Sequence, residues 1–350
     1  MSLVGPIAGL TLAALVAPLA AAAQDIPAQE FDVLGTWRQG SMYEEFEAPL
    51  WETQIPEASG GAISVNIQAY TDVGVSGSEV IRLLDSGIYD FAAVGYTYIA
   101  SGDAVFEGND LALAPRNAAE ARQIVEAYED VARTALADIH DIHLIADYPF
   151  PAQLLACSQP FETLADLEGR KIRVYSTALG DLVEGLGATS VTIPLQDVVP
   201  ALQRGLVDCG ITSGLSMYLA GWQDVASHVY EVPVAAGIAF FAASSEAWSG
   251  LDATTQELIS AEVRQFADDA WNGAEALGDQ GIACLTGQGT CDFGEGADMT
   301  LVSPGPEDEA IRERVLSDYV LARWATRCGE DCAADWNAAV APIVGVEAQP

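Results

Sequence analysis

Short apolar runs alternate with segments of amphipathic spacing along the first half of the chain. The runs are typical of buried strands, and between them apolar side chains recur every three or four residues, as in helices. Strands are expected from residue 30 and at 62–70, 89–96 and 143–147, and helices at 41–51, 79–87 and 118–139. Ser78 is the expected N-cap of the helix at 79–87. Strands and helices in this order predict a parallel sheet with helices on both faces.

The same alternation restarts near Pro151 and continues to about Val232. Strands are expected here at 152–158, 171–176, 190–194 and 206–214, and helices at 164–169, 178–187 and 196–205. One more strand at 238–244 precedes segments of helical spacing at 254–277 and 307–325. The chain is therefore predicted to form two α/β units. Ligands of open α/β sheets bind beyond the carboxyl ends of the strands, so the candidate site is a cleft formed by the loops at 36–40, 68–72, 94–98, 173–176 and 211–214.

The N-terminal residues 3–23 carry no charge and end in small residues, within the stretch APLAAAAQD. This pattern is typical of a secretory signal cleaved before Gln24, although no basic residue precedes the apolar run. A membrane anchor is the alternative, and it is disfavoured because Gly5, Pro6 and Pro18 weaken a spanning helix. No later segment reaches the ~18 apolar residues of a spanning helix. We therefore expect a periplasmic protein with no membrane insertion after removal of the signal.

Carboxylates dominate the charge of the chain. Its 14 Lys+Arg residues stand against 51 Asp+Glu residues, the formal net charge is −37 at pH 7, and Lys171 is the only lysine. Such a surface repels nucleic acid and anionic membranes, which excludes both as partners. The excess of carboxylates also suggests a salty habitat, where ions screen the repulsion between them.

Six cysteines, an even number in an exported chain, favour disulfide bonds. The short spacings favour Cys284–Cys291 and Cys328–Cys332, which leaves Cys157 with Cys209. Six cysteines can pair in many ways, so this connectivity is a preference. A metal site is the alternative, and it is disfavoured because the three histidines lie far away in sequence and no C-x-x-C motif occurs.

No catalytic motif stands out in the sequence. The chain has no phosphate-binding loop of the Walker type and no G-x-S-x-G elbow, and the stretch GLGATS lacks the third glycine of a dinucleotide fingerprint. The pair His140 and His143 has no adjoining carboxylate and is more typical of a solvated surface than of a metal site. We therefore expect no enzymatic activity, no cofactor and no metal.

Three cations gather in the stretch EGRKIRVYS, at Arg170, Lys171 and Arg173. Alternate side chains of a strand point to opposite faces, so Lys171 and Arg173 share one face. Arg173 lies further toward the carboxyl end of the strand and hence nearer the expected cleft. Its planar guanidinium can donate two parallel hydrogen bonds to a carboxylate without losing its charge. Arg173 is therefore the candidate anion-binding residue, and Arg170 and Lys171 are expected in solvent.

Three stretches carry a family resemblance: IRLLDSGIYDFAAVG, LADLEGRKIRV and LGATSVTIPLQDVVPALQRGLVD. They resemble the dicarboxylate-type solute-binding proteins of TRAP transporters (tripartite ATP-independent periplasmic transporters), and the resemblance runs from about Phe31 to Asn337. It implies an α/β, two-domain periplasmic-binding-protein (Venus-flytrap) fold with a long helix spanning both domains. After a signal peptide at 1–23, residues 24–150 with about 236–277 would form domain I, and 151–235 with about 278–350 domain II.

The resemblance also implies roles for single residues. In that family the arginine of the KIRV strand binds the ligand carboxylate, and here it is Arg173. Two positions depart from the family pattern, because Gln153 stands where many relatives have an arginine and Thr212 where many have an asparagine. Either the ligand is less anionic than a dicarboxylate, or a second cation binds it, for which Arg38 is the best candidate. Further candidate ligand contacts at matching loop positions are Trp37, Gln39, Tyr70, Gly95 and Tyr96.

The function implied by this resemblance is that of a periplasmic solute-binding protein. Such a protein captures a small organic acid in an interdomain cleft and delivers it to the membrane subunits of a TRAP-type secondary transporter. Two other functions stay open: an exported α/β hydrolase-like enzyme, which the missing nucleophile motif disfavours, and a ligand sensor that uses the same binding fold.

The net charge predicts that the fold is stabilised by salt. Dissolved ions screen the repulsion among the carboxylates, so the melting temperature should rise with ionic strength. Thermal unfolding followed by circular dichroism from low to molar NaCl measures the effect, and a melting temperature that stays constant over this range would contradict it.

Overall fold

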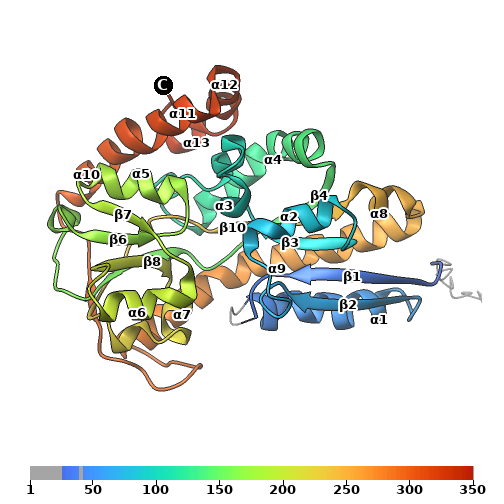
Figure 1. Ribbon diagram of the computed structural model, residues 1–350, viewed down its shortest axis with the longest axis horizontal. Coiled ribbons are helices and arrows are strands. Elements are labelled where there is room, and N and C mark those ends of the chain that lie inside the picture. The colour runs from blue at the N-terminus through green and yellow to red at the C-terminus, as the bar shows by residue number, and fades with distance from the viewer. Residues whose placement is uncertain (1–25, 39–41, 350) are drawn as a thin grey trace, which may run out of the picture.

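Two β-sheets flanked by helices lie side by side in the computed structural model of the protein, which describes residues 26–38 and 42–349 (Figure 1). The expected signal peptide at 1–23 and the candidate residue Gln39 lie outside these ranges. Within the described ranges, none of the helices combines the length and the apolar character that a membrane crossing requires.

The first sheet has the strand order β2-β1-β3-β10-β4. Its strands are β1 (Gln29–Gly35), β2 (Ile63–Ala69), β3 (Phe91–Gly95), β4 (Ile142–Pro149) and β10 (Ile238–Ser244). β1 runs parallel to β2 and β3, whereas β10 is antiparallel to both of its neighbours. The four strands predicted to form a parallel sheet, β1 to β4, do run in one direction, but the sequence analysis did not foresee that antiparallel β10 separates β3 from β4. β10 returns from the second sheet and enters between β3 and β4 from the opposite end, and its residues are buried throughout, as a central strand requires.

The second sheet has the strand order β11-β9-β5-β8-β6-β7. Its strands are β5 (Gln153–Cys157), β6 (Lys171–Val174), β7 (Thr189–Thr192), β8 (Cys209–Ser213), β9 (His228–Tyr230) and β11 (Thr300–Val302). β6 is parallel to β7 and β8, and β5 is antiparallel to β8 and β9. β6, which carries Arg173, is therefore an inner strand with a neighbour on each side.

Helices cover both sheets. Two are long, α4 (Ala118–His140) and α9 (Ala253–Thr286). The shorter α-helices are α1 (Ile55–Ala58), α2 (Gly77–Asp85), α3 (Tyr96–Ile99), α5 (Thr177–Gly185), α6 (Val198–Gln203), α7 (Gly214–Leu219), α8 (Ser245–Gly250), α10 (Asp308–Val315), α11 (Ala322–Cys328), α12 (Glu330–Ala339) and α13 (Ala341–Val344). Short 3₁₀ or π segments are η1 (Tyr43–Glu47), η2 (Leu50–Gln54), η3 (Ala104–Asn109), η4 (Leu164–Leu167), η5 (Leu195–Asp197), η6 (Trp222–Asp224) and η7 (Leu316–Leu321).

The N-cap of α2 is Ser76, so the prediction of Ser78 was wrong. Glu79 lies three residues after Ser76, and its carboxylate accepts hydrogen bonds from the Ser76 backbone N–H at 3.0 Å and from the Ser76 hydroxyl at 2.6 Å. The Ser76 side chain in turn faces the backbone N–H of Glu79, which completes a capping box, and the sequence S-G-S-E satisfies it only from its first serine.

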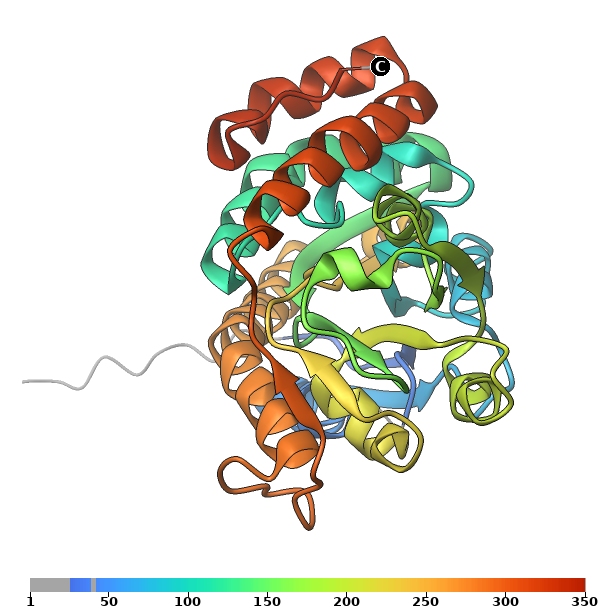
Figure 2. The same cartoon turned by 90° about the vertical axis from the view of Figure 1, so that its left-hand side faces the viewer.

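The helix α9 runs along both sheets, as Figures 1 and 2 show. It has 34 residues, which corresponds to a length of about 50 Å. One part of it packs on β4 and α4 beside the first sheet, and another part packs on α7 beside the second. Gly281 lets α9 approach α7 closely, since a Cβ at that position would lie 2.4 Å from the backbone nitrogen of Leu215. The predicted long helix is thus confirmed, and it supports both sheets.

The C-terminal helices pack on α4 and η3 (Figure 2). Trp324 and Trp336 donate their indole N–H groups to the carbonyls of Ala104 and Gly108, at 2.8 and 3.1 Å. Arg327 binds Glu107 of η3 at 2.6 Å and Asp181 of α5 at 2.7 Å. One arginine of α11 therefore connects an element beside the first sheet with one beside the second. The division of the chain into domains stays a prediction.

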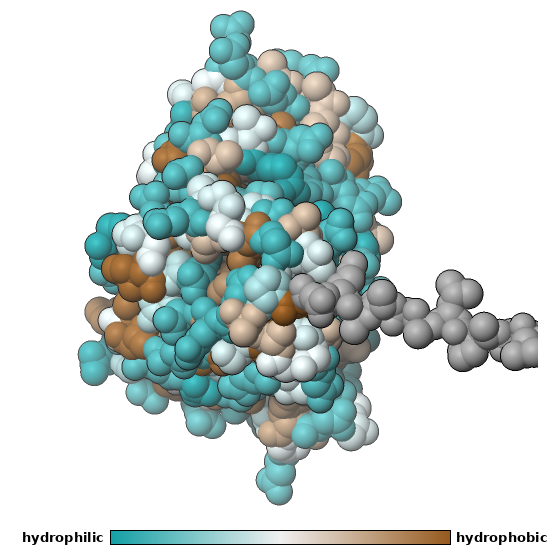
Figure 3. Space-filling view, turned by 90° about the vertical axis from the view of Figure 1, so that its right-hand side faces the viewer, coloured by the Kyte–Doolittle hydropathy of each residue, from teal (hydrophilic) through white to brown (hydrophobic). Residues whose placement is uncertain are grey.

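Most of the negative charge lies at the surface. Among the described residues, six Asp or Glu side chains are buried. Figure 3 shows one face of the molecule, where hydrophilic residues dominate and hydrophobic ones are scattered among them. Screening by salt acts on charges of this exposed kind.

The structure contains the three disulfide bonds that the spacing favours. Cys157–Cys209 joins residues that face each other on β5 and β8, Cys284–Cys291 closes the loop after α9, and Cys328–Cys332 connects α11 with α12.

The disulfide Cys157–Cys209 should stabilise the fold more than Cys328–Cys332. It closes a separation of 52 residues, against 4 for the other bond. On the chain-entropy model, the double variant C157S/C209S should lose about 4 kcal/mol of unfolding free energy, and C328S/C332S about 2 kcal/mol. Urea unfolding of both variants measures the difference, after intact mass has shown that the wild-type cysteines are oxidised. Equal losses, or a larger loss from C328S/C332S, would contradict this ranking.

Candidate functional site

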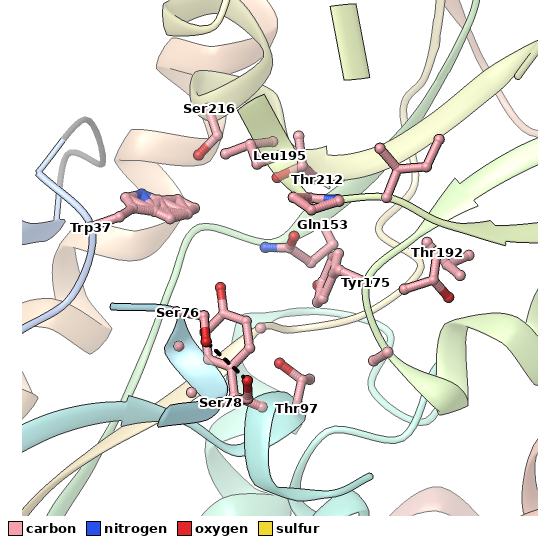
Figure 4. A pocket seen from close by; sticks show the side chains of 18 of the residues that line it. Trp37, Ser76, Ser78, Thr97, Gln153, Tyr175, Thr192, Leu195, Thr212 and Ser216 are labelled. Atoms are coloured by element: carbon pink, nitrogen blue, oxygen red, sulfur yellow. Dashed lines mark hydrogen bonds between the residues drawn. The ribbon is translucent and has the colours of Figure 1, made fainter. Parts of the chain in front are cut away.

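A cavity of about 1380 Å³ opens between the two sheets. One wall comes from the segments that follow β1, β2 and β3 and from α2, and the other comes from the ends of β6, β7 and β8 with α5 and α7 (Figure 4). All five loops expected at the carboxyl ends of the strands contribute residues to it. Its volume exceeds the ~300–1,000 Å³ typical of ligand clefts and cavities, so it offers more room than one small ligand fills.

Arg173 is fixed in the wall of this cleft by backbone carbonyls on both sides. Its Nε donates a hydrogen bond to the carbonyl of Ile193 at 2.8 Å, and its Nη1 donates one to the carbonyl of Ile211 at 2.7 Å. The guanidinium carbon lies 5.3 Å from the centre of the Tyr175 ring. These bonds come from the segments on either side of β6, so the strand order itself orients the guanidinium.

The charge of Arg173 has no anionic partner in the protein. Its residue is 3% exposed, and in the described part of the chain no carboxylate lies within salt-bridge distance of it. Burial lowers the pKa of Arg173 to about 10, so the side chain stays charged at neutral pH. A guanidinium has more N–H donors than its two carbonyl bonds use. Since a buried, unpaired charge is costly, the arrangement favours an anion in the cleft.

Gln153 and Thr212, the two departures from the family pattern, also line the cleft. Both are buried, and they lie on the neighbouring strands β5 and β8. The Nε2 of Gln153 donates to the carbonyl of Pro151 at 2.8 Å. The structure thus brings Arg173, Gln153 and Thr212 to one cavity wall as a cation, an amide and a hydroxyl.

A buried carboxylate that the sequence analysis missed holds the segment behind Gln153. Asp110 accepts hydrogen bonds from the backbone N–H groups of Ala236, Gly237 and Ile238, at 3.2, 3.0 and 3.2 Å. Burial raises the pKa of Asp110 to about 6, and the three N–H groups oppose this rise. Nothing in the local sequence distinguishes Asp110 from the other carboxylates, because its partners lie more than 120 residues away.

Gly237 was also missed by the sequence analysis, because its contact with Gln153 forms only in the folded chain. Its φ is +76°, and a Cβ at this position would lie 2.7 Å from the Nε2 of Gln153. The segment can therefore pass behind Gln153 only as glycine. In the sequence, Gly237 is simply one glycine in an apolar stretch.

Glu47 is a second buried carboxylate, and it fixes a turn of the opposite wall as Asp110 fixes the segment behind Gln153. It is fully buried and accepts hydrogen bonds from the N–H and the hydroxyl of Thr36, both at 2.7 Å, and from the hydroxyl of Tyr148 at 2.8 Å. Burial raises the pKa of the Glu47 carboxyl above its usual range. These bonds fix the turn after β1, where Thr36 and Trp37 line the cleft.

The other predicted contact residues divide into two groups. Trp37, Tyr70 and Gly95 line the cleft. Arg38 does not, because its guanidinium is bound at the surface by Asp72 and Glu44. Tyr96 does not either, since α3 begins at this residue and its side chain enters the core, where the hydroxyl donates to Asp147 at 2.6 Å. Ligand contact by any of these residues stays a prediction.

Arg170 lies outside the cleft, but the expectation that it is simply solvated was wrong. It donates hydrogen bonds to the carbonyls of Asp166, Gln159 and Pro160, at 3.0, 3.0 and 2.6 Å. Lys171 is exposed, as expected. Within the described ranges, no group of His, Cys, Asp and Glu residues has the arrangement of a metal site.

The chain matches the model of one protein family, the bacterial extracellular solute-binding proteins of family 7, over residues 34–291. Similar solved structures include an extracytoplasmic solute receptor from Bordetella pertussis that binds pyroglutamic acid (20% identity, TM-score 0.76, 89% of this chain and 99% of that one). Another is a TRAP periplasmic solute-binding protein from Desulfovibrio salexigens with bound orotic acid (16% identity, TM-score 0.77, 90% of this chain and 99% of that one). A third, a TRAP periplasmic solute-binding protein from Sulfitobacter sp. NAS-14.1, contains β-D-galacturonate (15% identity, TM-score 0.75, 89% of this chain and 99% of that one). These likenesses confirm the predicted two-domain α/β binding-protein fold.

Gly237→Ala should weaken ligand binding through Gln153. The new Cβ would displace the Gln153 amide, and the left-handed backbone should cost about 1–2 kcal/mol of stability. Gly205→Ala is the matched control, because Gly205 also has a positive φ of +66° but has open space around it. The measurement is calorimetry with the organic acid that raises the wild-type melting temperature most in a thermal-shift screen. Equal affinities of the two variants would contradict the role of Gly237.

Proposed function

The chain belongs to family 7 of the bacterial extracellular solute-binding proteins, and on that premise we propose that it captures a small organic acid between its two sheets and delivers it to a TRAP-type transporter. It works in the periplasm, after cleavage of the signal at 1–23, and without catalysis. Its partners are the acid and the membrane subunits of the transporter.

The observation that carries this proposal is the buried cation of the cleft. Arg173 is held by the carbonyls of Ile193 and Ile211, stays charged, and has no carboxylate partner among the described residues. A carboxylate of the ligand supplies the missing charge and accepts the remaining N–H groups of the guanidinium. The acids bound by the relatives from Bordetella pertussis and Desulfovibrio salexigens agree with a ligand of this class.

Closure of the cleft completes the capture. The ligand first meets one wall, and bonds to both walls form only when they approach each other, so the ligand shifts the population toward the closed form. α9 packs beside both sheets and is the common support about which they move. The transporter then distinguishes the closed, loaded form from the open one.

The alternative of a hydrolase-like enzyme finds no support in the cleft. Serine hydroxyls line it, but none of the three histidines does, so no serine has a histidine base there. A sensor would capture its ligand in the same way and differ in its partner. Transport is proposed because the chain shares its family with receptors of TRAP transporters.

Arg173→Lys should keep the charge and the fold and weaken binding of the acid ten- to a hundredfold. Lysine cannot form two parallel bonds to one carboxylate, and a lost charge-assisted hydrogen bond costs about 1.5–3 kcal/mol. Arg173→Ala should bind more weakly still, because the charge of the ligand is then buried without a partner. Isothermal titration calorimetry with the best acid of the thermal-shift screen measures all variants.

Arg38→Ala and Arg170→Ala are the matched controls for these substitutions. Each removes a guanidinium outside the cleft wall, so each should leave the affinity within about twofold once the protein is folded. Arg170→Ala should still lower the melting temperature, because three carbonyls lose their donor. Loss of binding in a control, with Arg173→Lys unaffected, would show that the wrong cation has been chosen.

A further inference from the structure

The cleft is rich in hydroxyl groups and poor in cations. Seven serines, six threonines and three tyrosines line it, and Arg173 is the only Lys or Arg of its described wall. This balance goes beyond the requirement for an anion. The part of the ligand that does not carry the carboxylate should therefore bond to hydroxyls rather than to charged groups.

A single cation limits the ligand to one carboxylate. Arg38, the best candidate for a second cation from the sequence, is bound by Asp72 and Glu44 and lies outside the wall. The wall also carries four carboxylates, those of Glu79, Asp110, Asp181 and Glu184. Asp181 and Glu184 are already paired with Arg323 or Arg327, which lie outside the wall. A second carboxylate on the ligand would therefore lose its hydration in a closed cleft and gain no cationic partner.

Several hydroxyls of the cleft are not engaged within the protein. Those of Ser176 and Ser213 cap α5 and α7, and that of Ser76 binds Glu79. By contrast, the side-chain hydroxyls of six lining residues have no hydrogen-bond partner in the described structure, among them those of Thr97, Tyr175, Thr192 and Thr212.

These four hydroxyls lie on both walls. Figure 4 shows Thr97 on the side of the first sheet, and Tyr175, Thr192 and Thr212 on the side of the second. Nη1 of Arg173 bonds to the carbonyl of the residue before Thr212, and its Nε bonds to the carbonyl of the residue after Thr192, so both threonines adjoin residues that hold the guanidinium. A hydroxyl both donates and accepts, which matches it to hydroxyls of a ligand better than to a second charge.

Aromatic rings provide the apolar part of the site. Trp37, Tyr70, Tyr98, Phe150 and Tyr175 line the cleft. Trp37 packs against Phe150 with ring centres 5.7 Å apart, and its indole N–H is buried without a partner in the described structure. Rings with an apolar face and a polar edge suit a ligand that presents C–H groups on one side and hydroxyls on its rim.

We propose that the ligand is a polyhydroxylated monocarboxylate, that is, a sugar acid of the aldonate or uronate class. Its carboxylate binds Arg173, its hydroxyls bind Thr97 and Thr212 from the two walls, and its C–H face packs on Trp37. This inference rests on the proposed function, and it narrows the organic acids that the site accepts.

A panel of probes that varies the number of carboxylates and of hydroxyls tests the inference. D-galacturonate and D-gluconate have one carboxylate and several hydroxyls, galactarate has a second carboxylate, D-galactose has none, and hexanoate, pyroglutamate and succinate lack hydroxyls. At least one of the first two acids should bind the purified protein about tenfold or more tightly than every other probe, by calorimetry. Tightest binding of galactarate, hexanoate, pyroglutamate or succinate would overturn the inference and leave the proposed function standing. Tightest binding of galactose, or binding of no probe, would count against both.

Isosteric variants locate the hydroxyl contacts. Thr97→Val and Thr212→Val each remove one hydroxyl at nearly constant volume, and each should reduce affinity for the best sugar acid about fivefold or more. Thr189→Val is the matched control, because Thr189 lies on β7 with Thr192 but is exposed and outside the cleft wall. Unchanged affinity in both Thr97→Val and Thr212→Val would overturn the assignment. The use of one threonine from each wall keeps the test valid if one variant fails to fold.

Discussion

The candidate binding site is organised around one buried guanidinium. Arg173 lies on an inner strand of the second sheet, and the carbonyls of Ile193 and Ile211 orient it toward the space between the sheets. Isolated burial of such a charge is unfavourable. Under the proposed function, the carboxylate of the ligand supplies the missing anion when the cleft closes and so offsets this cost. The affinity for the acid and the energetics of closure therefore come from the same group.

The rest of the site consists of supports for this group and for the surfaces that face it. Glu47 fixes the turn that carries Trp37, and Asp110 fixes the segment that passes behind Gln153. Both are carboxylates buried in a chain of net charge −37, and both are satisfied by backbone N–H or hydroxyl donors rather than by cations. With 14 Lys+Arg residues against 51 Asp+Glu residues, such donors replace salt bridges inside the protein. Arginines also act inside the protein, as Arg173 does in the cleft and Arg327 does between α5 and η3.

The parts that the sequence predicted are those whose signal is local. The spacing of apolar residues marks strands and the long helix, the short cysteine separations favour their pairing, and the position of Arg173 near the end of a strand places it at the cleft. The parts that were missed depend on distant contacts. The direction of β10 is set by its return from the second sheet, and Asp110 and Gly237 meet only in the folded chain. Arg38 was proposed as a ligand contact because nothing in the sequence distinguishes its partners Glu44 and Asp72 from the other carboxylates of the chain.

A crystal structure of the protein with the best-binding acid of the thermal-shift screen tests the central claim most directly. We expect a closed cleft with the ligand carboxylate against Arg173, at the ~2.7–2.9 Å of charge-assisted hydrogen bonds, and with the bonds of Arg173 to Ile193 and Ile211 unchanged. A ligand that presents a neutral group to Arg173, or that binds away from it, would contradict the account.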